Sequence, residues 1–141
     1  MLRKDMRALV ALHARAREIK GRWGEWALMA IGVIACLAPA IRIRQRKKLR
    51  EEIVRDMVWT VGQCLLAGDY EFSEDDLRSY THEQLRGFML SLDAVIVEAL
   101  TIFGVKDYIL PTLDAWQDEP DGFYAKEAWP KVREWLETAL A

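Results

Sequence analysis

Residues 26–41 read WALMAIGVIACLAPAI, sixteen positions without a charged or amide side chain. A basic cluster follows at once, made of Arg42, Arg44, Arg46, Lys47, Lys48 and Arg50. An apolar run of this kind is typical either of a short membrane anchor or of the central helix of a bundle. The partners available to the chain differ between a membrane anchor and a buried central helix.

The flanks of the apolar run favour a membrane. Sixteen helical residues rise about 24 Å, less than the hydrocarbon thickness of about 30 Å, but snorkelling basic side chains and local thinning can close the gap. Tryptophans stand where an aromatic belt would lie, and the basic cluster stands where a cytoplasmic flank would lie. We therefore predict contact with a membrane or with phosphate groups at Trp23, Trp26, Arg42, Arg44, Arg46, Lys47, Lys48 and Arg50.

Charge divides the chain near position 50. Residues 1–50 hold thirteen Lys and Arg against three Asp and Glu, whereas residues 51–141 hold seven against nineteen. Only two of the fourteen aromatic residues precede position 50. We predict that residues 1–48 form a basic module of one amphipathic and one apolar helix, and that residues 49–141 form an acidic all-α domain with its own core.

Helical periodicity runs through the whole chain, and no segment alternates as a strand would. The fold class is predicted to be all-α, a helical bundle of about five helices in which the apolar helix is either a membrane anchor or the bundle centre. Thr81 and Gln84 resemble a capping box that starts a long helix. Pro39 is expected to kink or interrupt the apolar helix, and residues 69–79 are expected to form an acidic turn.

The sequence carries no catalytic signature. Cys36 and Cys64 have neither disulfide nor metal-ligand spacing, and His13 and His82 are isolated, so no enzyme activity, no cofactor and no metal site are predicted. No Walker loop, dinucleotide fingerprint, HExxH or GxSxG motif occurs. The reducing cytoplasm is the simplest compartment for such a chain.

Three kinds of partner follow from the pattern. Trp116, Trp129 and Trp135 are either core residues or an aromatic patch for a protein partner. Small residues at 32, 36 and 40 give the apolar helix a line along which a second copy can pack, which makes it a candidate for homo-oligomer formation. Nucleic acid is a minority hypothesis, because the basic segment lacks aromatics of its own and the rest of the chain is acidic.

These observations predict a non-enzymatic, membrane-associated adaptor or regulator at the inner face of the cytoplasmic membrane. It would bind a protein partner through its acidic helical domain. The alternative is a fully soluble, cytoplasmic helical-bundle regulator or inhibitor, acting as a charge mimic or in association with nucleic acid, with residues 26–41 as its buried core helix.

Overall fold

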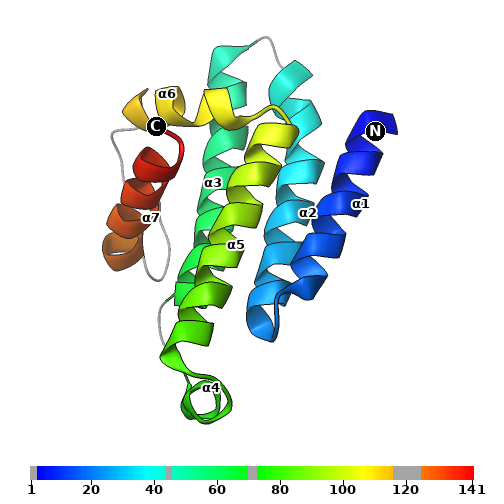
Figure 1. The fold of residues 1–141 in the computed structure, drawn as a ribbon. Helices are drawn as coiled ribbons and strands as arrows, with labels where there is room; N and C mark the ends of the chain where they lie inside the picture. The colour runs from blue at the N-terminus through cyan, green and yellow to red at the C-terminus, as the bar shows by residue number, and fades with distance from the viewer. Residues whose placement is uncertain (1–2, 44–45, 70–72, 116–124) are drawn as a thin grey trace.

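The computed structural model describes residues 3–43, 46–69, 73–115 and 125–141 (Figure 1). These residues form an all-α helical bundle, which confirms the predicted fold class, with seven helices rather than about five and with no strand in the described ranges. The helices are α1 (Arg3–Glu18), α2 (Arg22–Ile43), α3 (Lys47–Asp69), α4 (Glu74–Ser79), α5 (His82–Ile102), α6 (Lys106–Ala115) and α7 (Ala125–Ala139).

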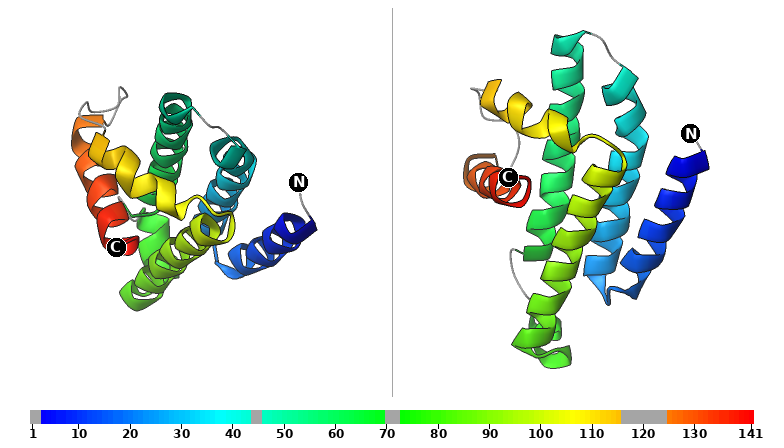
Figure 2. Two further views of the ribbon diagram at one scale, coloured as in Figure 1. Left: turned by 90° about the horizontal axis from the view of Figure 1, so that it is seen from above. Right: turned by 45° about the horizontal axis from the view of Figure 1, so that its top comes forward.

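Three long helices, α2, α3 and α5, stand side by side in the middle of the molecule (Figures 1 and 2). Helix α1 packs against α2 and α5, and α7 packs against α3 on the opposite side of the bundle. Helix α6 turns by 99° from α5 and crosses the end of the bundle at which α2 finishes and α3 begins. The short α4 lies at the other end, before the start of α5.

Helix α2 contains the whole apolar run and contacts α1, α3 and α5. One side of it is fully buried, because Ile31, Ile34 and Ile41 join the same hydrophobic core as residues of α3 and α5. Small buried side chains on the same side of α2 let the neighbouring helices approach; they are Ala27, Ala30, Ala35 and Ala38. The core therefore continues across position 48, the predicted boundary between the basic module and the acidic domain.

Two expectations about breaks in the helices need correction. Pro39 does not interrupt the apolar helix, since α2 continues through it to Ile43. The ring of Pro39 removes one backbone donor, the N–H that would bond to the carbonyl of Ala35, and α2 continues without that bond. Residues 74–79, expected to be part of a turn, form α4.

Hydrogen bonds of the capping-box type start both α4 and α5. The Thr81 hydroxyl accepts the backbone N–H of Gln84 at 3.2 Å, and the Gln84 side chain accepts the N–H of Thr81 at 2.9 Å, as the sequence predicted. Ser73 and Asp76 make the same pair of bonds before α4. Accepting the N–H of Ser73 holds the pKa of the Asp76 carboxyl below its ordinary value, and Arg22 at 3.1 Å adds to the effect.

The turn between α1 and α2 is tight and is anchored in the core. Gly21 has a φ of +69°, a conformation that glycine adopts without a steric cost. A Cβ on Gly24 would lie 2.5 Å from the carbonyl oxygen of Ile19 and 3.0 Å from that of Ala16. Trp23 is fully buried, with its ring 5.4 Å from that of Phe88 in α5. The start of α2 is thereby fixed against both α1 and α5.

We expect Gly24→Ala to lower the free energy of unfolding by about 2–3 kcal/mol, because the added methyl group meets two backbone oxygens that cannot move independently. Urea unfolding followed by circular dichroism at 222 nm measures the change. Gly87→Ala is the matched control in α5, where a Cβ would meet no atom within 4 Å. That variant should have a free energy of unfolding about 0.5–1 kcal/mol higher, because alanine favours the helix over glycine. Similar effects in both variants would contradict the close contact at Gly24.

Candidate interaction surfaces

The first candidate surface is the end of the bundle where α1 starts, α2 finishes and α3 begins (Figure 1). We call it the basic end and define it by Ile43 and five exposed basic residues: Arg3, Lys4, Arg46, Lys47 and Lys48. The side chain of Ile43 is 76% exposed in the midst of this charge. A large apolar side chain surrounded by basic ones is typical of a surface that meets anionic lipid.

Two arginines of the sequence cluster have partners within the bundle. Arg42 Nη2 lies 3.2 Å from Oδ2 of Asp5, a carboxylate in a residue only 6% exposed. This ion pair joins the last turn of α2 to the first turn of α1. The guanidinium of Arg50 lies 4.8 Å from the centre of the Tyr108 ring, which joins α3 to α6. Of the predicted contact residues, Arg46, Lys47 and Lys48 lie exposed, and Arg44 lies outside the described residues.

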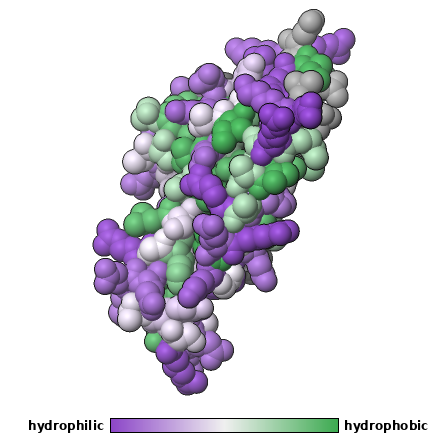
Figure 3. Space-filling model, turned by 45° about the vertical axis from the view of Figure 1, so that its right-hand side comes forward, coloured by the Kyte–Doolittle hydropathy of each residue, from purple (hydrophilic) through white to green (hydrophobic). Residues whose placement is uncertain are grey.

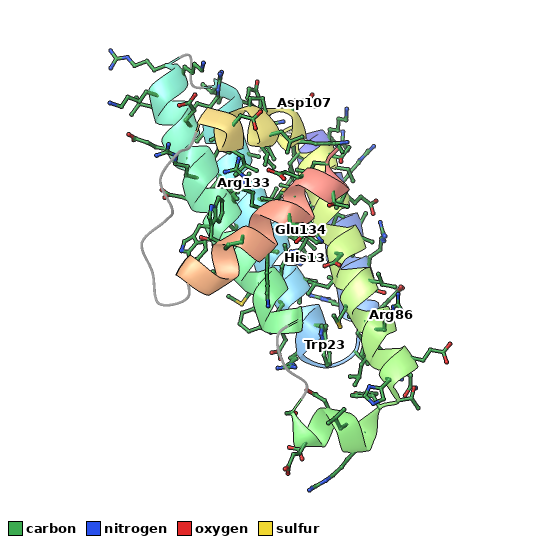
Figure 4. The ribbon with its side chains drawn as sticks, turned by 90° about the vertical axis from the view of Figure 1, so that its left-hand side faces the viewer. His13, Trp23, Arg86, Asp107, Arg133 and Glu134 are labelled. Carbon is green, nitrogen blue, oxygen red and sulfur yellow. The ribbon has the colours of Figure 1, made fainter. Side chains whose placement is uncertain are left out.

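The tryptophans before position 50 do not form an exposed belt. Trp23 is fully buried beside Phe88, and Figure 4 labels it at the end of α2 nearest α4. Trp26 is half-buried and packs on the core. The prediction of a membrane contact at Trp23 therefore finds no support in its position, because its ring fills the space between the α1–α2 turn and α5.

The late tryptophans hold α7 against the bundle. Trp129 is 5% exposed and meets Trp59 of α3 edge to face, with the ring centres 6.1 Å apart. Gly62 of α3 makes room beside it, since a Cβ there would lie 2.7 Å from Cγ1 of Val132. Trp135 is half-buried on the same core, and Trp116 lies outside the described residues. Packing thus accounts for most of the surface of Trp129.

The outer side of α7 is polar. Arg133 donates from Nε to Glu137 at 3.0 Å, and Glu134 is exposed beside them (Figure 4). Asp107 is exposed on α6, and Glu83 is exposed at the start of α5. The acidic half of the sequence therefore places carboxylates on the outer sides of α5, α6 and α7.

The second candidate surface is the side of α2 that faces away from the core. We call it the open face of α2 and define it by Met29, Gly32, Val33, Cys36, Ala40 and Ile43, which recur at helical spacing. Met29 is 55% exposed, and Cys36 is exposed between it and Ile43. A Cβ on Gly32 would meet no atom within 4 Å. By length and composition alone, α2 is also the one single helix among the described residues that could cross a membrane.

The flank of α1 that lies away from α5 carries two exposed apolar side chains. Arg15 forms an ion pair with Glu98 of α5, which fixes the flank that faces α5. Met6 and Val10 lie on a different side of the α1 wheel, and both are strongly exposed. On the face shown in Figure 3, hydrophilic side chains dominate the end near α4, and hydrophobic ones show between the charged groups farther along.

Among the described residues, no three His, Cys, Asp or Glu side chains gather in a way that could hold a metal ion. A solvent-open hollow of about 620 Å³ lies between α4 and α5, lined by Tyr80, Thr81 and His82 among others. Burial raises the pKa of the Cys64 thiol from 9.0 to about 11, whereas Cys36 is exposed.

No protein-family model matches this chain, and searches of curated proteins and of solved structures give no significant match.

The two thiols should react at very different rates. At a dilution that keeps the chain a single copy, we expect one thiol per folded chain to react rapidly with Ellman's reagent at pH 8, because Cys36 is exposed and Cys64 is buried with a raised pKa. Cys36→Ser should abolish the rapid phase, and Cys64→Ser should leave it unchanged. Unfolding in guanidinium should restore two reactive thiols in the natural chain. Rapid reaction of Cys64 in the folded protein would contradict its burial.

The Asp5–Arg42 ion pair should stabilise the docking of α1. We expect Arg42→Ala to lower the free energy of unfolding by about 2–3 kcal/mol, because it leaves the buried carboxylate of Asp5 without this partner. A double-mutant cycle with Asp5→Ala, measured by urea unfolding, should give a coupling energy of about 1 kcal/mol or more. Arg17→Ala, at an exposed position of α1, is the control and should change stability by less than about 0.5 kcal/mol. Additive effects of Asp5→Ala and Arg42→Ala would refute the pair.

Proposed function

We propose that this chain is a non-enzymatic adaptor or regulator that attaches to the inner, anionic face of the cytoplasmic membrane through its basic end. It holds its acidic outer helices in the cytoplasm for a protein partner with a complementary basic surface. The observation that carries the proposal is the exposure of Ile43 among Arg46, Lys47 and Lys48. The attachment is peripheral, with α2 kept inside the bundle.

The energetics of the basic end suit reversible attachment. Each Lys or Arg close to an anionic bilayer contributes about 1 kcal/mol, so the five basic residues together supply about 3–5 kcal/mol. Insertion of Ile43 adds a second, apolar contribution. Two weak signals of this kind are what peripheral anchoring requires.

Charge also supports a partner away from the membrane. The exposed carboxylates of α5 and α7, among them Glu83 and Glu134, belong to the half of the chain that an anionic surface repels. The same carboxylates attract a basic protein surface and speed its association. Membrane attachment raises the local concentration of this acidic surface, which is the basis of a tethering function.

A second candidate is the wholly soluble helical-bundle regulator. The observation that favours it is the burial of Ile31, Ile34 and Ile41 under α1, α3 and α5, since a helix covered on one side by protein needs no lipid there. The two candidates share the acidic partner surface. They differ in whether the basic end binds lipid.

Sedimentation with lipid vesicles tests the proposal. We expect the full chain to pellet with vesicles that contain phosphatidylserine, to stay in solution with neutral phosphatidylcholine vesicles, and to be released by high salt. Lys47→Glu combined with Lys48→Glu should weaken binding at least about 30-fold. The matched control combines Arg17→Glu with Lys20→Glu, two exposed basic residues in the last turn of α1 and just beyond it. It should bind the anionic vesicles far more tightly than the Lys47 and Lys48 double variant.

Three results would refute peripheral attachment by the basic end. The first is equal binding of the two double variants. The second is retention in the pellet after a high-salt wash, which indicates insertion of α2. The third is no binding to anionic vesicles at low salt, which favours the soluble regulator.

A further inference from the structure

The open face of α2 is unusual because it remains apolar from Met29 to Ile43 while the opposite side of the same helix forms the core. Exposed polar residues normally cover the outer side of a helix in a bundle. Here the two largest exposed apolar side chains of α2 stand at the ends of the face, and smaller residues stand between them. A surface with this shape accepts a helix laid along it.

Four residues of the open face are placed symmetrically about Cys36. Met29 and Ile43 lie seven residues before and after it, and both are large and exposed. Gly32 and Ala40 lie four residues before and after it, and both are small. In a two-fold antiparallel pair of identical helices centred on Cys36, residues at equal distances on either side come to the same level. Large residues then stand opposite large ones, and small residues opposite small ones.

The charges at the two ends of the face fix the direction of such a pair. Glu25 is exposed at the start of α2 and lies on the same side of the helix as the open face. Beyond Ile43, at the other end, Arg46 and Lys47 are exposed. An antiparallel pair brings Glu25 of each chain toward the basic end of the other, whereas a parallel pair brings like charges together.

We infer that the open face of α2 is a homodimer interface, which seats the same face of a second copy of this chain in antiparallel orientation with Cys36 at the two-fold axis. This inference does not rest on membrane attachment, and because the dimer face uses the side chain of Ile43, dimerisation and insertion of Ile43 into lipid compete with each other. It names the occupant of a surface that the fold of one copy leaves uncovered, and the complementarity of both size and charge belongs to the face itself.

The proposed geometry brings the two copies of Cys36 within bonding distance. Packed helices lie about 8–10 Å apart, and each Cα stands about 2.3 Å from its helix axis, so facing Cα atoms are about 3.4–5.4 Å apart. A disulfide spans Cα atoms that are about 4.4–6.8 Å apart. Mild oxidation of the dimer should therefore join Cys36 to Cys36 without disturbing either bundle.

Sedimentation velocity on the reduced full chain should show a species of twice the 16.3 kDa chain mass, in a concentration-dependent equilibrium with monomer. Oxidation with copper phenanthroline should trap it as a covalent dimer on non-reducing gels. The covalent dimer should persist in Cys64→Ser, because Cys64 is buried, and disappear in Cys36→Ser.

A pairwise experiment tests the antiparallel direction. Two variants are made in the Cys36→Ser background, one with Met29→Cys and one with Ile43→Cys, and they carry tags of different size. A short bis-maleimide should link the two variants efficiently when they are mixed, and should link neither efficiently to itself. Self-linking of the Met29→Cys variant would indicate a parallel pair and would overturn the assignment.

Charge placed at the centre of the face should separate the copies. Cys36→Glu sets two carboxylates against each other at the axis and should weaken dimerisation about 100-fold. Leu90→Glu, at a similarly exposed apolar position on α5, is the control and should leave the dimer intact. Circular dichroism should be unchanged in both variants, since both positions are exposed.

Three outcomes would overturn the interface. One is a chain that stays monomeric up to about 0.1 mM, which means a dissociation constant weaker than about 0.1 mM. Another is a monomer in which Cys36→Glu abolishes binding to phosphatidylserine vesicles, which would assign the open face to lipid. Dimerisation that Cys36→Glu leaves unchanged would place the interface elsewhere and would equally refute the inference.

Discussion

The packing of three helices against one side of α2 is the constraint on which the bundle depends. Ile31, Ile34 and Ile41 are buried because α1, α3 and α5 all contact this helix. The small alanine side chains on the same side of α2 allow the neighbouring helices to pack close to it. Because Gly24 brings the start of α2 against the backbone of α1, the position of α1 follows from that of α2.

Local signals in the sequence predict most of the helices, and the start of α4 carries such a signal too, whereas long-range contacts decide the rest. The capping box at Thr81 needs only Gln84, three residues away, and it was predicted correctly. Ser73 and Asp76 carry the same signal, but the acidic residues around them were read as a turn. The side of α2 that faces the core could not be read from the sequence, because apolar residues occupy its outer side too and periodicity disappears.

The same limit applies to the candidate surfaces. Within the basic cluster, nothing in the sequence distinguishes Arg42 and Arg50 from Lys47. The difference arises from Asp5 and Tyr108, which lie 37 and 58 residues away along the chain. Trp23 likewise stands at the edge of the apolar run, as an interfacial residue would, and is buried because Phe88 meets it from α5. Composition identified a basic, apolar region, and tertiary contacts decided which of its side chains reach the surface.

The central position of α2 has a consequence for the synthesis of the chain. Helices α3 and α5, which cover its inner side, end at residues 69 and 102, and these residues are synthesised 28 and 61 positions after residue 41. At about 5–20 residues per second, α5 is complete about 3–12 s after the apolar run. During that interval the nascent chain presents a bare apolar helix with basic flanks, the pattern that a signal anchor presents. Folding of α3 and α5 onto α2 therefore competes in time with capture of the nascent chain.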